Sequence, residues 1–253
     1  GWEASLGAKG PVAPVLGFLL LKLVGSAWAA GRLLAMLCHL ILVFQCHDLG
    51  RRLGGTHRAG LLSAALCGLS PMVYGWGRLA FRDILVAVMV ALSLQIMLRM
   101  DLARWRQAAL LGAVLGLGLM SKLSFVIFMT APGIWFLATR VRSKRQVMGL
   151  GVGLAAMLAT CGWWLIPVAG ELSTYVQKSG ARPEGEVWWA GLHHYLALPG
   201  VPLILAGALL GGVALWRLGR ERGAAIWAVG GAVVVSLLVH GLAASLWSRY
   251  IVP

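Results

Sequence analysis

Residues 69–83 read Leu69-Ser70-Pro71-Met72-Val73-Tyr74-Gly75-Trp76-Gly77-Arg78-Leu79-Ala80-Phe81-Arg82-Asp83. An apolar run ends here in two arginines and an aspartate, and another long apolar run begins directly after them. Charged groups with almost no loop to hold them must lie at a membrane surface or in a polar cavity beside it. Because that placement is costly, these residues are candidates for a functional site. A short, solvated turn between two helices is the alternative.

The composition indicates a membrane protein. Of the 253 residues, 60% are hydrophobic and 12% are charged, whereas a soluble domain carries about 25% charged residues. Apolar runs of about 15 to 23 residues alternate with short basic clusters, which predicts an all-α, polytopic transmembrane bundle forming one domain over 1–253. The formal net charge of +14 would suggest nucleic acid in a soluble protein. Here the basic residues lie mostly at helix ends, so we interpret them as orientation signals and expect no nucleic-acid partner.

The apolar pattern predicts about eight spans and one interfacial helix. The interfacial helix, from Pro14 to about Trp28, belongs to the end of a first external loop at 1–32. Six spans lie within 33–168 and two within 199–246, separated by an external loop at 169–198. The spans cover about 33–49, 60–77, 83–99, 107–121, 123–139, 147–168, 199–216 and 224–246. Glycine-rich runs predict close packing between helices; they contain Gly112, Gly116 and Gly118, and Gly149, Gly151 and Gly153.

The distribution of lysine and arginine sets the expected orientation. Four short loops hold thirteen of the 22 basic residues and should therefore be cytoplasmic; these are Arg51, Arg52 and Arg58, then Arg99, Arg104 and Arg106, then Arg140, Arg142, Lys144 and Arg145, then Arg217, Arg220 and Arg222. Both flanks of 107–139 are basic and belong on one side, which favours a hairpin turning at Ser121-Lys122 over one long helix. Each arm would be about 22–25 Å long. Lys122 would then lie slightly below the outer surface and need an anionic partner.

The outward-facing groups form a surplus of cations. They are Lys9, Lys22, Arg78, Arg82, Lys122, Lys178, Arg182 and Arg249, and among the acids we expect only Asp83 to approach a span. A lipid phosphate or diphosphate is the natural ligand, because arginine and lysine bind phosphate oxygens. Cations at a phosphate leaving group would also stabilise the charge that develops in a transfer reaction.

The long loop at 169–198 mixes acids, bases and aromatic residues, among them Arg182, Trp188 and His193. This composition suits a lid or an acceptor-binding loop, and a plain surface connection is the alternative. Adjacent histidines at 193 and 194 point about 100° apart on a helix, so we assign no metal site. We assign no cofactor either.

Several of these segments resemble one family in the same order. Leu69-Ser70-Pro71 followed by Arg78-Leu79-Ala80-Phe81-Arg82-Asp83 is similar to the "lsP…sRlallD" segment of polytopic GT-C glycosyltransferases of family 39. The proteins that it resembles are the bacterial relatives of the protein O-mannosyltransferases and of the aminoarabinose transferase that modifies lipid A, in family 39 and its neighbours. The other matching segments are Lys9-Gly10-Pro11 through Lys22-Leu23-Val24-Gly25, Ala30-Gly31-Arg32-Leu33, Gly116-Leu117-Gly118-Leu119-Met120-Ser121-Lys122, Trp188 to Pro202, and Arg249-Tyr250-Ile251-Val252-Pro253.

The resemblance implies an enzyme of the bacterial inner membrane with an outward-facing, periplasmic cavity. There a polyprenyl-phosphate-linked sugar would be bound and its sugar transferred to an acceptor. By position, Lys9, Arg78, Lys122, Arg249 and the adjacent Tyr250 would contact the lipid phosphate or shape its pocket. Asp83 would orient one of those cations or the sugar. A secondary transporter or lipid flippase with an outward cationic pocket is the alternative.

Two features depart from the family pattern. Gly10-Pro11 stands where the family has two prolines. The family's catalytic acid follows its first span, so we expect it upstream of Gly1 and expect this chain to be an internal piece, inactive alone. The catalytic base for the acceptor is then not among these residues.

Overall fold

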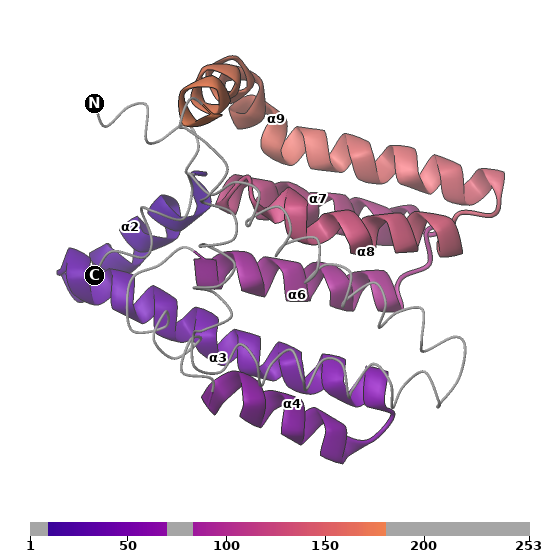
Figure 1. Cartoon of the computed structure of the whole chain (residues 1–253), viewed down its shortest axis with the longest axis horizontal. Helices are drawn as coiled ribbons and strands as arrows, with labels where there is room; N and C mark the ends of the chain where they lie inside the picture. Colours follow the sequence, from indigo (N-terminus) through magenta and orange to yellow (C-terminus); the bar gives the residue numbers. More distant parts are fainter. Residues whose placement is uncertain (1–9, 70–82, 181–253) are drawn as a thin grey trace. The chain divides into compact units, whose positions relative to one another are not determined.

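The computed structural model describes residues 10–69 and 83–180, and the side chains within them as far as residue 169. These residues contain seven helices and no strand, in agreement with the all-α prediction (Figure 1). The helices are α2 (Val12–Val24), α3 (Ala27–Gly54), α4 (His57–Leu69), α6 (Asp83–Arg99), α7 (Trp105–Ser121), α8 (Phe125–Arg140) and α9 (Lys144–Gly180). The predicted spans at 199–216 and 224–246 lie outside the described residues.

Two of the described helices are long and apolar enough to cross a membrane, Ala27–Gly54 and the Lys144–Ala169 part of α9. The shorter α2 and α8 are apolar as well. The total of eight spans stays a prediction.

Several helix boundaries differ from the predicted ones. The predicted interfacial helix ends at Val24, because Gly25 adopts a left-handed conformation (φ 71°) and closes α2. Ser26 then caps α3 by accepting a hydrogen bond from the Ala29 amide, so Trp28 belongs to α3 and not to the interfacial helix. At the other end, α9 continues to Gly180 through residues where a loop was predicted from 169. The sequence from 171 to 179 contains neither proline nor glycine to end it.

The chain divides into two compact units, 1–126 with 136–168, and 127–135 with 169–253. This division does not test the prediction of a single transmembrane domain, and every contact described below lies within the first unit. There α3 lies alongside both α4 and α6 (Figure 1), and α6 also contacts α7. The core joins Ala35, Cys38 and Leu42 of α3 to Ile84, Leu85, Val88 and Ala91 of α6.

Glycines bring α7 and α9 together, as predicted. A Cβ atom on Gly112 would lie 1.9 Å from the carbonyl oxygen of Gly153, and one on Gly116 would lie 2.8 Å from Cβ of Thr160. Helices that approach this closely gain dispersion contacts that bulkier residues would prevent. Gly151 is an exception, because a Cβ atom there would meet nothing within 4 Å.

Candidate functional site

The turn between α7 and α8 holds Lys122 in place. Helix α7 ends at Ser121 and α8 begins at Phe125, so 107–139 is not one long helix and the break lies at the predicted position, Ser121-Lys122. Ser121 is fully buried, and its hydroxyl donates to the carbonyl of Leu117. Phe125 is buried over Gly118, where a Cβ atom would lie 2.4 Å from the ring. The glycine therefore leaves the space into which the chain folds back.

Lys122 pairs with Asp83, the first residue of α6. The Lys122 ammonium donates a hydrogen bond of 2.5 Å to Oδ1 of Asp83, across 39 residues of sequence. Both side chains are partly exposed, 27% for Lys122 and 31% for Asp83. The anionic partner expected for Lys122 is thus Asp83, while the role of Asp83 in orienting a cation or the sugar at a binding site stays a prediction. The carboxylate also lies at a helix N-terminus, where the backbone favours negative charge.

Gly10 brings the N-terminal segment to the same place. It is buried, and a Cβ atom on it would lie 1.6 Å from the carbonyl oxygen of Met120, two residues before Lys122. A proline has that Cβ atom, so the departure from the family's proline pair has a steric reason here. Lys9 is the next residue in sequence and lies outside the described residues.

An apolar groove begins next to Asp83. It has a volume of about 360 Å³ and is bounded by α2, the first turns of α3 and the first turn of α6. Ile84 and Leu85, which follow Asp83, form part of its wall, with Phe18, Leu21 and Leu34 among the other lining residues. The Lys22 ammonium lies 5.2 Å from the centre of the Phe18 ring. An apolar groove whose wall includes the residue next to a charged pair suits a lipid whose polar end carries charge.

The structure thus brings together Asp83 and Lys122 from the predicted set. The remaining candidates lie outside the described residues; they are Lys9, Arg78, Arg182, Trp188, His193, Arg249 and Tyr250. Their assignment to a phosphate pocket, or to a lid in the case of Arg182, Trp188 and His193, stays a prediction.

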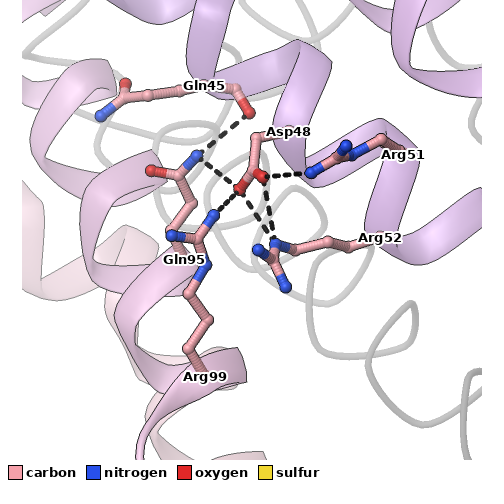
Figure 2. A network of polar contacts seen from close by, with 6 residues as sticks. All are labelled: Gln45, Asp48, Arg51, Arg52, Gln95 and Arg99. Carbon is pink, nitrogen blue, oxygen red and sulfur yellow. Dashed lines mark hydrogen bonds and ion pairs between the residues drawn. The ribbon is translucent and has the colours of Figure 1, made fainter. Parts of the chain in front are cut away.

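A second charged group was missed by the sequence analysis. Asp48 lies within α3, so the expectation that only Asp83 among the acids approaches a span is wrong. Its carboxylate accepts from Arg52 Nε at 3.0 and 3.1 Å, from Gln95 Nε2 at 3.0 Å and from Arg99 Nη2, and lies 3.7 Å from Arg51 Nη2 (Figure 2). We call Asp48, Arg51, Arg52 and Arg99 the Asp48 cluster. Its signal in the sequence was an acid one helical turn before two arginines.

The two charged groups lie at opposite ends of α6. Asp83 is its first residue and Arg99 its last, which places them about 24 Å apart along the axis at 1.5 Å per residue. Each ion pair joins residues that the positive-inside count puts on one side, Asp83 with Lys122 and Asp48 with Arg99. This agrees with the predicted alternation of the helices, while their absolute orientation stays a prediction.

A comparison with protein families decides what kind of protein this is. The model of the dolichyl-phosphate-mannose-protein mannosyltransferases matches residues 8–165, which is well over half of the 253 residues. The chain belongs to this family. The match confirms the resemblance to GT-C glycosyltransferases of family 39 and includes Gly10, Asp83, Lys122 and the groove. No curated protein and no solved structure matches the chain.

Membership in the mannosyltransferase family makes the chain a membrane glycosyltransferase in general terms, with a lipid-linked sugar donor and an acceptor. It counts against the alternative of a secondary transporter or flippase. The charged pair beside an apolar groove is the feature of the described residues that fits such a donor.

Proposed function

We propose that this protein transfers a sugar from a polyprenyl-phosphate donor to an acceptor at the outer, periplasmic face of a bacterial inner membrane. The observation that carries the proposal is the Asp83–Lys122 pair, because the residue after Asp83, Ile84, lines the apolar groove. The polyprenyl chain would enter the groove, and its phosphate would lie at Lys122.

The two charges have different roles in this proposal. Lys122 supplies the positive charge that attracts a phosphate oxygen, and its ion pair with Asp83 fixes where that charge lies. Asp83 then fixes the position of the amine at the helix end and is not itself consumed. Arg78 and Arg82 precede Asp83 closely in sequence, and Lys9 precedes Gly10. We propose that they supply the remaining positive charge, with Arg249 and Tyr250 completing the pocket.

The reaction requires charge stabilisation at the phosphate. The bond between the sugar's anomeric carbon and the phosphate oxygen breaks, a bond from that carbon to the acceptor forms, and polyprenyl phosphate leaves with the electron pair. A cation held at the phosphate stabilises the charge that develops there. The acceptor's proton passes to a general base as the new bond forms.

Transfer activity tests the proposal. The full-length protein is reconstituted in proteoliposomes with polyprenyl-phosphate-linked mannose, and product is measured for wild type, Lys122→Ala and Arg78→Ala. The matched control is Lys144→Ala, because Lys144 is exposed at the start of α9. Loss of a charge-stabilising group should lower the rate by about a hundredfold or more, with Lys144→Ala near wild type. Wild-type rates in both site variants would contradict the proposal.

A further inference from the structure

The Asp48 cluster lies at the end of α6 away from the proposed donor site and carries excess positive charge. Three guanidinium groups surround one carboxylate, which leaves a formal charge of +2. Asp48 is 18% exposed, whereas Arg51, Arg52 and Arg99 are 53%, 38% and 48% exposed. The Asp48 carboxylate is therefore enclosed, and the outward surface of the Asp48 cluster consists of guanidinium groups (Figure 2).

The contacts with Asp48 leave most of the guanidinium donors available. Each guanidinium has five N–H groups. Asp48 is contacted by one nitrogen from each arginine, namely Nε of Arg52, Nη2 of Arg99 and Nη2 of Arg51. The Asp48 carboxylate thus holds three guanidinium groups close together. This arrangement suits the oxygens of a phosphate group.

An exposed apolar face of α3 leads to this cluster. Leu37, Leu40 and Phe44 are 41%, 56% and 73% exposed. Their spacing of three and four residues places them on one side of the helix, and Arg51 follows seven residues after Phe44 on that same side. The buried residues Ala35, Cys38 and Leu42 belong to the core with α6. This side of α3 therefore presents an apolar surface that ends in arginine.

We propose that the Asp48 cluster binds the phosphate of an anionic phospholipid, whose acyl chains lie against Leu40 and Phe44. The positive-inside bias alone would place arginines at one membrane face. It would not bring three arginines from two helices to a single carboxylate. The convergence, and the apolar face beside it, are features of a headgroup site between helices. An anionic headgroup fits a charge of +2, whereas a zwitterionic one would bring its own cation to the arginines.

Arg51 provides the test, because it is the most exposed of the three and makes the longest contact with Asp48. Its removal leaves the contacts of Arg52 and Arg99 in place. The matched control is Arg104→Gln, which also removes one arginine; Arg104 is 72% exposed and lies 3.9 Å from Asp101. The full-length protein, freed of lipid in detergent, is titrated with dioleoylphosphatidylglycerol, and the rise of Tm gives an apparent Kd.

The expected result is a saturable rise of Tm in wild type, with an apparent Kd about fivefold weaker in Arg51→Gln and unchanged in Arg104→Gln. Dioleoylphosphatidylcholine at the same concentrations should raise Tm much less. Equal affinities in the two variants would overturn the proposal, as would an equal effect of phosphatidylcholine. An equal rise with inorganic phosphate would assign the site to free phosphate and exclude the lipid.

Discussion

The contact between α7 and α9 gives the sharpest test of the helix arrangement. In Gly112→Ala, the new Cβ atom would lie 1.9 Å from the carbonyl oxygen of Gly153 and 2.7 Å from its carbonyl carbon. Both are backbone atoms, so no side-chain rotation relieves the clash. To reach a carbon contact distance of roughly 3.5 Å, the two helices must separate locally by about 1.5 Å.

The cost of this separation can be set against the helix propensity of alanine. Overpacking of a tight contact costs about 1–3 kcal/mol, and replacing glycine by alanine in a helix returns up to about 1 kcal/mol. Because the clash is with backbone atoms, the cost lies in the upper part of that range, about 2–3 kcal/mol, and Gly112→Ala should destabilise the protein by about 1–2 kcal/mol. Gly151→Ala is the matched control on α9, because its Cβ atom meets nothing within 4 Å; it should be neutral or stabilise by up to about 1 kcal/mol.

Reversible unfolding in mixed micelles with increasing sodium dodecyl sulfate measures both variants. The structure requires that the free energy of unfolding falls for Gly112→Ala and does not fall for Gly151→Ala. If both variants change by the same amount, α7 and α9 do not pack through Gly112 and Gly153, and the reasoning fails.

Three further predictions concern the charged pairs and the N-terminal segment. The first is a double-mutant cycle of Asp83→Asn and Lys122→Met, measured by the same unfolding assay. Because the pair is partly exposed, the coupling free energy should be about 1–2 kcal/mol. Additive effects would mean that the two side chains do not interact. Asp48→Ala should lower the free energy of unfolding by about 1–2 kcal/mol, because three arginines lose their shared acceptor, and a loss that persists undiminished in high salt would argue against this electrostatic origin. Gly10→Ala should lower Tm, while Gly17→Ala, with open space around it, should not; similar Tm values would contradict the contact of Gly10 with Met120.

The hydrophobic pattern alone predicted where helices lie. The helix predicted at 83–99 has the observed bounds Asp83–Arg99, because apolar residues fill it and charges mark both ends. The helix break at Ser121-Lys122 was also predictable, since basic residues flank both 107–121 and 123–139 and the orientation rule brings these flanks to one side. Helix boundaries inside an apolar stretch were harder to predict. Gly25 and Ser26 end one helix and cap the next, within a stretch that was predicted as a single helix from Pro14 to about Trp28.

Pairing across the sequence was only partly predictable. The predicted position of Lys122, slightly below the outer surface, implied that it needs an acidic partner. Asp83 was the acid expected at the outer face. Asp48 and Arg99 are 51 residues apart, and their contact depends on how α3 and α6 pack, which no local pattern records. The steric role of Gly10 likewise depends on Met120 of a distant helix. The pair expected from the sequence, Lys122 with Asp83, was found, whereas the contacts of Asp48 and Gly10 depended on tertiary packing.

The central claim is that Lys122, held by Asp83, binds the phosphate of a polyprenyl lipid. Direct binding of polyprenyl phosphate to the full-length protein tests it, with wild type, Lys122→Met and the control Lys144→Met compared, and with polyprenol as the ligand that lacks phosphate. Loss of the contact should weaken binding of polyprenyl phosphate about tenfold in Lys122→Met, with Lys144→Met like wild type and polyprenol equally weak in all three. Equal binding of polyprenyl phosphate by wild type and Lys122→Met would contradict the claim.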